Sequence, residues 1–186
     1  MAEITEKRYT GAEFLSRNEL DENTYYELVN GKIVKKSSPN PRHQLILAKI
    51  YDLVSNYIKK NKSGTVLFAP IDVFLDNETV VIPDLIYISN DNKKIITNNG
   101  IEGCPDLVVE ILSPSTAKYD RGIKMKAYKR NQVAEYWIID PKAHALEVYV
   151  YQDQDYDLLS YAVEEGNIES QILQGFSLSI KELFDS

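Results

Sequence analysis

The chain of 186 residues contains one cysteine, Cys104, and two histidines. A lone thiol cannot form an intrachain disulfide, which fits a reducing compartment, and so few cysteines and histidines argue against a zinc site built from them. No apolar run approaches the roughly 18 residues that a membrane helix needs. The charged N-terminus, residues 1–15, lacks the apolar core of a secretory signal. The sequence therefore predicts a cytoplasmic protein that does not enter a membrane.

Positive charge is also scarce, because 21 Lys and Arg face 28 Asp and Glu for a formal charge of −7. This balance excludes a protein that coats nucleic acid through charge alone. It is compatible with an enzyme whose bound divalent cations supply positive charge locally. The sequence contains no internal repeat and no linker rich in Gly, Ser or Pro. We therefore expect residues 1–186 to form a single domain.

Local patterns predict a mixture of helices and strands. Thr10 and Glu13 have the spacing of a capping box and predict a helix over 10–18. Asn30-Gly31 between two β-type runs predicts a hairpin, and Asn40-Pro41 opens a helix that we expect to reach about residue 60. The remaining patterns predict strands over 66–75, 80–89, 106–112, 134–140, 146–151, 158–163 and 168–173, helices over 119–131 and 177–184, and a polar loop over 90–103.

The order of these elements indicates an α/β fold. The apolar run over 106–112 is typical of a strand buried on both faces. It is followed by a helix and a further strand, which predicts a βαβ unit. Hairpins before and after this unit make the expected sheet mixed. The sequence thus predicts a mixed β-sheet with helices on both sides.

Three acidic residues lie where the strand pattern calls for apolar side chains. Asp84 interrupts the alternate positions of 80–88, Glu110 lies between Val108 and Leu112, and Asp72 lies within the run 68–74. An ionised carboxylate in such a place costs several kcal/mol unless it is paired or binds a metal ion. A divalent cation would compensate two or three of them at once.

Each of these acids has a simpler interpretation. Asp84 follows a proline and could face water at a strand end, and Asp72 could be a solvated edge residue. Glu110 is harder to explain in this way, because it precedes a βα loop at the end of a strand that looks central, where α/β proteins place their sites. A buried ion pair between Glu110 and a structural Arg or Lys remains an alternative.

The helix expected after Glu110 offers a partner for it. Asp120, Lys124 and Tyr128 are spaced i, i+4, i+8 and share one side of the helix. Lys124 could reach inward to the strand carboxylates or extend to solvent. Helix periodicity alone favours a plain surface pair between Asp120 and Lys124.

These residues belong to an ordered set of motifs: 26–31 (YELVNG), Ser38-x4-His43, 81–84 (VIPD), 108–116 (VVEILSPST), Asp120-x3-Lys124-x3-Tyr128 and 134–141 (AEYWIIDP). The set resembles the Uma-type family of bacterial endonucleases, within the restriction-endonuclease-like PD-(D/E)XK superfamily. The resemblance covers about residues 8–184 and implies a restriction-endonuclease-like mixed β-sheet flanked by helices.

The resemblance also implies a catalytic set. Asp84 and Glu110 match the two acids of the superfamily motif, whereas Leu112 occupies the usual lysine position. In the Uma-type relatives the following helix provides the lysine, which implies Lys124 here. Asp84 and Glu110 would then hold one or two Mg²⁺ or Mn²⁺ ions together with the Ile111 carbonyl. Lys124 would orient the attacking water or neutralise charge on the phosphate.

Three further residues are implied as supporting groups. Glu27 would add a metal ligand through water, and Asp72 would be an outer or secondary ligand. His43 would contact phosphate or orient a metal-bound water, although an ordinary histidine at a helix N-terminus is an equally good interpretation.

The resulting hypothesis is a metal-dependent endonuclease that hydrolyses DNA phosphodiester bonds, with the DNA backbone as substrate and a homodimer as the expected assembly. The alternatives are a catalytically inactive binding or regulatory module with the nuclease fold, and a nuclease that cleaves RNA. Thirteen tyrosines could serve a protein interface or simply occupy strands. Because the chain is acidic, DNA binding calls for a local basic groove, for which the candidates are Lys93, Lys94, Lys118, Arg121, Lys124 and Lys126.

Overall fold

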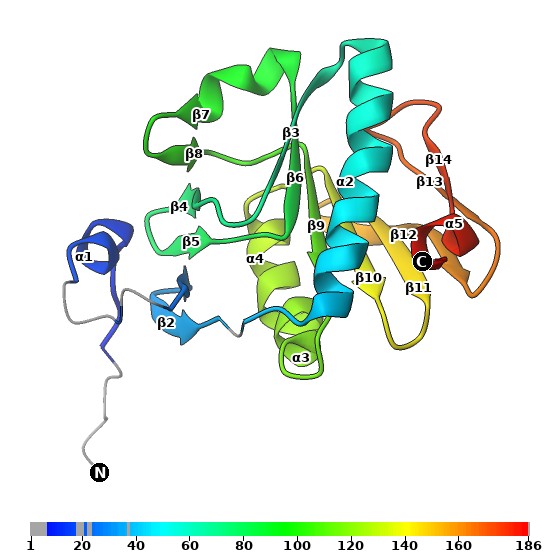
Figure 1. The fold of residues 1–186 in the computed structure, drawn as a ribbon. Coiled ribbons are helices and arrows are strands. Elements are labelled where there is room, and N and C mark those ends of the chain that lie inside the picture. Colours follow the sequence, from blue (N-terminus) through cyan, green and yellow to red (C-terminus); the bar gives the residue numbers. More distant parts are fainter. Residues whose placement is uncertain (1–6, 18–20, 22–23, 37, 186) are drawn as a thin grey trace.

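The computed structural model describes residues 7–17, 21, 24–36 and 38–185 (Figure 1). Most strands form two six-stranded sheets, in the orders β2-β1-β5-β4-β8-β7 and β12-β11-β10-β9-β6-β3. Both sheets are mixed, because β4 and β8 are parallel in the first and β9 and β10 are parallel in the second, while their other pairs are antiparallel. The predicted α/β class with mixed pairing is confirmed.

The first sheet contains β1 (Tyr26–Val29), β2 (Lys32–Lys35), β4 (Val73–Asp76), β5 (Thr79–Val81), β7 (Ile96–Thr97) and β8 (Gly100–Glu102). The second contains β3 (Gly64–Phe68), β6 (Leu85–Ser89), β9 (Leu107–Ile111), β10 (Glu135–Asp140), β11 (Ala145–Gln152) and β12 (Asp155–Val163). A short two-stranded pair is formed by β13 (Asn167–Glu169) and β14 (Ser177–Ser179). The helices are α1 (Gly11–Leu15), α2 (Pro41–Asn61), a 3-10 helix (Asn90–Ile95), α3 (Ala117–Tyr119), a π-helical turn (Asp120–Lys124), α4 (Met125–Arg130) and α5 (Ile180–Phe184).

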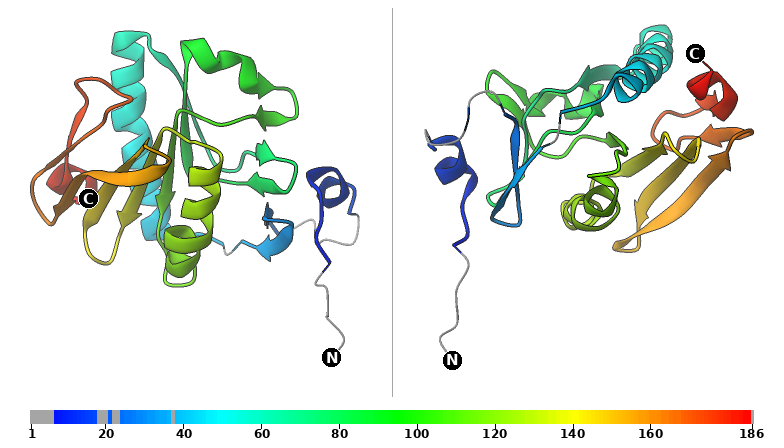
Figure 2. Two further views of the ribbon diagram at one scale, coloured as in Figure 1. Left: turned by 180° about the vertical axis from the view of Figure 1, so that it is seen from behind. Right: turned by 60° about the horizontal axis from the view of Figure 1, so that its bottom comes forward.

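Helices cover both faces of the second sheet. Figure 1 shows α2 in front of this sheet, and the view from behind in Figure 2 shows α3 and α4 in front of the opposite face. The side chains of β9 alternate accordingly. Val109 and Ile111 pack in the apolar cluster of α2, whereas Val108 packs in that of α4. Glu110 has the register of Val108, so it faces the helix over 117–130.

The N-terminal predictions agree closely with the structure. The capping box of α1 is present, with the Glu13 N–H donating to Thr10 Oγ1 and the Thr10 N–H donating to Glu13 Oε2. The helix ends at Leu15 rather than at 18, and residue 18 lies outside the described residues. The hairpin of β1 and β2 turns at Asn30-Gly31, where both φ angles are positive (52° and 74°).

The strands predicted over 66–75 and 80–89 were wrong in extent, because each is broken into two. β3 and β6 belong to the second sheet, whereas β4 and β5 belong to the first. Each break contains a proline, Pro70 or Pro83, which cannot donate to a strand ladder. Asp72 and Asp84 therefore lie in connections between the sheets, and the alternation across Asp84 does not describe a single face.

Further predictions also need correction. The predicted loop over 90–103 contains the 3-10 helix and the hairpin of β7 and β8. The helix predicted over 119–131 begins at 117, the strand predicted over 168–173 is limited to β13, and the segment 177–184 begins with β14. The strands β7, β8, β13 and β14 have two or three residues each, which is too short for an alternating pattern to reveal.

In the described part of the chain, no helix is both long enough and apolar enough to cross a membrane.

Candidate active site

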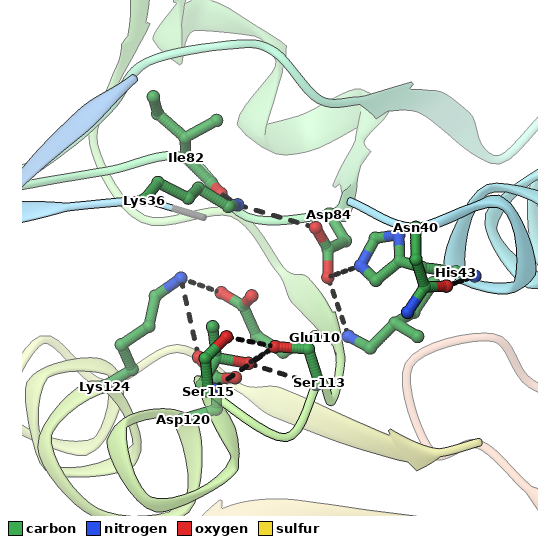
Figure 3. Close-up of polar contacts among 12 residues, drawn as sticks. Lys36, Asn40, His43, Ile82, Asp84, Glu110, Ser113, Ser115, Asp120 and Lys124 are labelled. Carbon is green, nitrogen blue, oxygen red and sulfur yellow. Dashed lines mark hydrogen bonds and ion pairs between the residues drawn. The ribbon is translucent and has the colours of Figure 1, made fainter. Parts of the chain in front are cut away.

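A cavity of about 410 Å³ is lined by residues from both sheets. Its walls come from the β1–β2 hairpin, the first turns of α2, the connections after β3 and before β6, the end of β9 and the segment 113–124. Segments far apart in the sequence therefore meet here. The close-up in Figure 3 shows the charged side chains at this place. They form two linked groups, one around Asp84 and one around Glu110.

Asp84 is buried, with 4% of its surface exposed, in the connection between β5 and β6. Its Oδ2 accepts a hydrogen bond from the Ile111 N–H at 2.8 Å and lies 3.1 Å from His43 Nε2. Lys36 Nζ lies 3.5 Å from Oδ1 (Figure 3). Burial raises the pKa of Asp84, but His43, Lys36 and the Ile111 N–H outweigh it and lower the pKa to about 2. Asp84 is therefore ionised at neutral pH.

Glu110, on β9, forms the second group with the helix above it. Lys124 Nζ lies 2.5 Å from Glu110 Oε1 and 2.9 Å from Glu27 Oε1, and the Tyr128 hydroxyl donates to Glu110 Oε1 at 2.6 Å. Lys124 is only 1% exposed. The interpretation of Asp120 and Lys124 as a surface pair was therefore wrong. The two do approach to 4.0 Å, but both are buried among the other carboxylates.

Burial and charge oppose each other in this group. Burial raises the pKa of Glu110, Lys124 lowers it, and the neighbouring Asp120 and Asp84 raise it further, so that it lies well above the usual range of a carboxyl group. Burial lowers the pKa of Lys124, but Glu110, Glu27 and Asp120 raise it well above its ordinary value. Lys124 thus provides a fixed positive charge in a pocket of carboxylates.

Two of the predicted supporting residues lie in the same cavity. Glu27, on β1, accepts the Ile82 N–H at 2.8 Å with the oxygen that also contacts Lys124. His43, at the start of α2, donates its backbone N–H to Asn40 Oδ1 at 2.9 Å and directs its ring toward Asp84. His43 thus lies in the first turn of the helix, capped by Asn40, and its ring reaches Asp84; its contact with phosphate or with a metal-bound water stays a prediction.

Asp72 does not join this arrangement. It is half-buried in the connection before β4 and does not line the cavity. Burial raises the pKa of its carboxyl. The structure thus brings together Glu27, His43, Asp84, Glu110 and Lys124, with Ile111 beside them, and leaves Asp72 outside.

The cations predicted to form a basic groove do not gather at this cavity. Of the six candidate cations, Lys124 alone is among the residues that line the cavity. Arg121 instead pairs with Glu147, through hydrogen bonds of 2.6 and 2.8 Å. The cation that does reach Asp84 is Lys36, just after β2. No local pattern identifies it, because it is 48 positions away from Asp84.

The oxygen donors fit a hard divalent cation. Mg²⁺ commonly binds through one or two carboxylates and keeps several waters. The contacts of Glu110 described above all involve Oε1. Among the described residues, the polar contact of Asp84 Oδ1 is the 3.5 Å approach of Lys36 Nζ, so each acid retains an oxygen for a ligand. Across the described residues, no three His, Cys, Asp or Glu side chains form a preorganised metal cluster. Asp84 and Glu110, together with water, are therefore a donor set that fits such an ion, and Glu27, Asp120 and Ile111 line the same cavity.

Comparison with known proteins assigns the chain to a family. The Uma2 family, described as "Putative restriction endonuclease", matches residues 12–181. The chain belongs to the Uma2 family. Of two relatives in Synechocystis sp. (strain ATCC 27184 / PCC 6803 / Kazusa), the uncharacterized protein slr1290 is 24% identical over 145 residues, covering 75% of this chain and 74% of the relative. The uncharacterized protein sll1609 is 24% identical over 151 residues, covering 80% and 84%.

A solved structure shares the fold of this Uma2 chain. It is the 1.96 Å crystal structure of a "putative nuclease belonging to DUF820" from Anabaena variabilis ATCC 29413. The similarity covers 95% of this chain and 97% of that one, with a TM-score of 0.74 and 22% sequence identity. The Uma2 chain therefore has the fold of that protein.

Proposed function

We propose that this Uma2 chain is a metal-dependent endonuclease that hydrolyses phosphodiester bonds in DNA, acting as a cytoplasmic homodimer. The observation that carries the proposal is the meeting of Asp84, Glu110 and Lys124 on one cavity, at the end of β9. Two acids and a lysine suit phosphodiester hydrolysis, since the acids can hold a metal ion and the lysine can balance phosphate charge. Membership of the family supports a nuclease.

In this proposal Asp84 and Glu110 hold Mg²⁺ or Mn²⁺, with Glu27 acting through water and the Ile111 carbonyl as a further oxygen donor. The ion would lower the pKa of a bound water and offset negative charge on the phosphate. The chain fixes both acids in place. The Ile111 N–H holds Asp84 Oδ2, and the Tyr128 hydroxyl holds Glu110 Oε1.

Lys124 donates to a phosphate oxygen in this proposal, since its ammonium group already points at the carboxylates that would hold the ion. Lys36 and His43 contact Asp84 and would contact the same or the next phosphate. A homodimer would present two such sites, one for each strand.

A second candidate function has one observation in its favour. Lys124 and Lys36 already pair with the buried carboxylates, so part of the negative charge of the site is balanced without a metal ion. A nuclease fold that had become a binding module would have this property. Such a module would cleave neither DNA nor RNA.

The test is cleavage of supercoiled plasmid, and of matched DNA and RNA oligonucleotides, in Mg²⁺ or Mn²⁺ and in chelator. We expect metal-dependent cleavage of DNA, reduced about 100- to 1,000-fold in Lys124→Ala and Glu110→Gln. Lys59→Ala is the control, because Lys59 is exposed on α2 and does not line the cavity. Thermal melts verify that each variant folds. Cleavage that persists in Glu110→Gln, or a wild-type chain that cuts nothing, would contradict the proposal, and cleavage restricted to RNA would correct its substrate.

A further inference from the structure

The proposed catalytic acids are deeply recessed. Asp84 is 4% exposed and Glu110 is 2% exposed, and both line the cavity of about 410 Å³. A volume of this size is typical of a site that encloses a small molecule. In an intact duplex each phosphate is held between stacked neighbours on a stiff, convex backbone. A flexible, unpaired strand can bend one nucleotide into such a cavity.

The lining of the cavity combines charged and apolar side chains. Lys36, His43 and Lys124 contact the acids that line it. Leu47 and Pro70 are among its apolar lining residues. A nucleotide likewise combines an anionic phosphate with a flat, largely apolar base.

The lining also includes aromatic side chains. Tyr25 lines the cavity and is 57% exposed, which is unusual for so large a side chain. Its backbone carbonyl accepts the backbone N–H of Lys36 at 2.8 Å, so the chain segments that carry these two side chains are held together. Tyr119 lines the cavity as well, from the segment that leads to Lys124. An exposed ring in a cavity that cations also line is an arrangement on which unpaired bases stack.

We propose that the cavity accepts one unpaired nucleotide of a nucleic-acid strand, with its phosphate toward Lys36, His43 and Lys124 and its base stacked on Tyr25. This inference rests on the proposed nuclease function and specifies its substrate class. Single strands, or positions where a nucleotide has left the duplex stack, are therefore the substrates. The enzyme reaches a paired position only when that nucleotide leaves the stack.

The test measures binding by fluorescence anisotropy with the full chain in chelator, so that nothing is cut. The probes are a labelled single-stranded DNA of about 12 nucleotides and the same sequence as a duplex, at equal salt. We expect the single strand to bind at least tenfold more tightly than the duplex. Tyr25→Ala should weaken single-strand binding by roughly 5- to 100-fold, whereas Tyr25→Phe should retain it. Tyr161→Ala is the control, because Tyr161 is 55% exposed on β12 and does not line the cavity.

The outcomes separate this inference from the proposed function. Tighter binding of the duplex, or a Tyr25→Ala variant that binds the single strand like the wild type, would overturn the inference. Duplex cleavage in Mg²⁺ would in that case still support the nuclease. Selective single-strand binding without cleavage in Mg²⁺ or Mn²⁺ would instead uphold the inference and contradict the nuclease.

Discussion

Replacement of Lys124 by methionine tests how the buried charges are balanced. Its ammonium group lies 2.5 Å from Glu110 and 2.9 Å from Glu27, and all three residues are at most 2% exposed. Lys124→Met keeps an unbranched side chain of similar length but leaves the two carboxyl groups without their cation. Removal of one partner from a buried ion pair costs about 3–5 kcal/mol. For a chain of this length, that loss corresponds to a fall in Tm of about 6–20 °C.

The assay is thermal and denaturant unfolding of wild type, Lys124→Met and the exposed control Lys126→Met, measured at several pH values. The loss of stability in Lys124→Met should be largest in alkaline solution. It should be smaller in acid, because the carboxyl groups left without a cation are protonated there. Adding Glu110→Gln to Lys124→Met should recover part of the stability, since it removes one of the unpaired acids. A Lys124→Met variant as stable as Lys126→Met at alkaline pH would refute the reasoning.

Three further outcomes are expected. The pKa of Glu110 is raised to about 8. The contribution of Glu110 to the free energy of unfolding is therefore present at low pH and is lost as the pH rises through that value. Glu110→Gln should remove this pH dependence from the free energy of unfolding. For the same reason, Mn²⁺ affinity measured by calorimetry should rise by up to about tenfold per pH unit until pH 8, because one proton must leave Glu110. Glu135 is fully buried and accepts four hydrogen bonds, from the Trp137 indole, the Ser170 hydroxyl and the N–H groups of residues 171 and 172. Glu135→Ala should therefore cost about 3–5 kcal/mol in chemical unfolding while leaving Mn²⁺ binding unchanged, and a loss of metal binding in this variant would contradict the site.

The part of the site on β9 could be predicted from the sequence because the alternation there is undisturbed. The run over 107–111 is buried on both faces, so the register alone assigns Glu110 to the same face as Val108. Leu112 packs in the same apolar cluster, which accounts for an apolar residue at that position. The lysine was assigned by the family resemblance, whereas helix periodicity favoured the surface.

The rest of the site depends on contacts that no local pattern contains. The buried Lys124 pairs with Glu27, which lies 97 positions earlier in the sequence. Asp84 is held by an N–H of β9 and by Lys36, and both contacts require the chain to pass from the first sheet to the second at Pro83. Strand alternation assumes that residues 80–88 form one strand of one sheet. It identified Asp84 as an acid on an apolar strand face, whereas the structure has Asp84 in the connection between β5 and β6.

Calorimetric titration with Mn²⁺ is the measurement that tests the central claim most directly. The wild type is compared with Asp84→Asn and Glu110→Ala, and with Asp72→Asn, an acid outside the cavity. We expect Mn²⁺ to bind to the wild type and to Asp72→Asn, and not to bind to the two site variants while they remain folded. A wild type that binds no Mn²⁺ at millimolar concentration, or a Glu110→Ala variant that binds as the wild type does, would contradict this expectation.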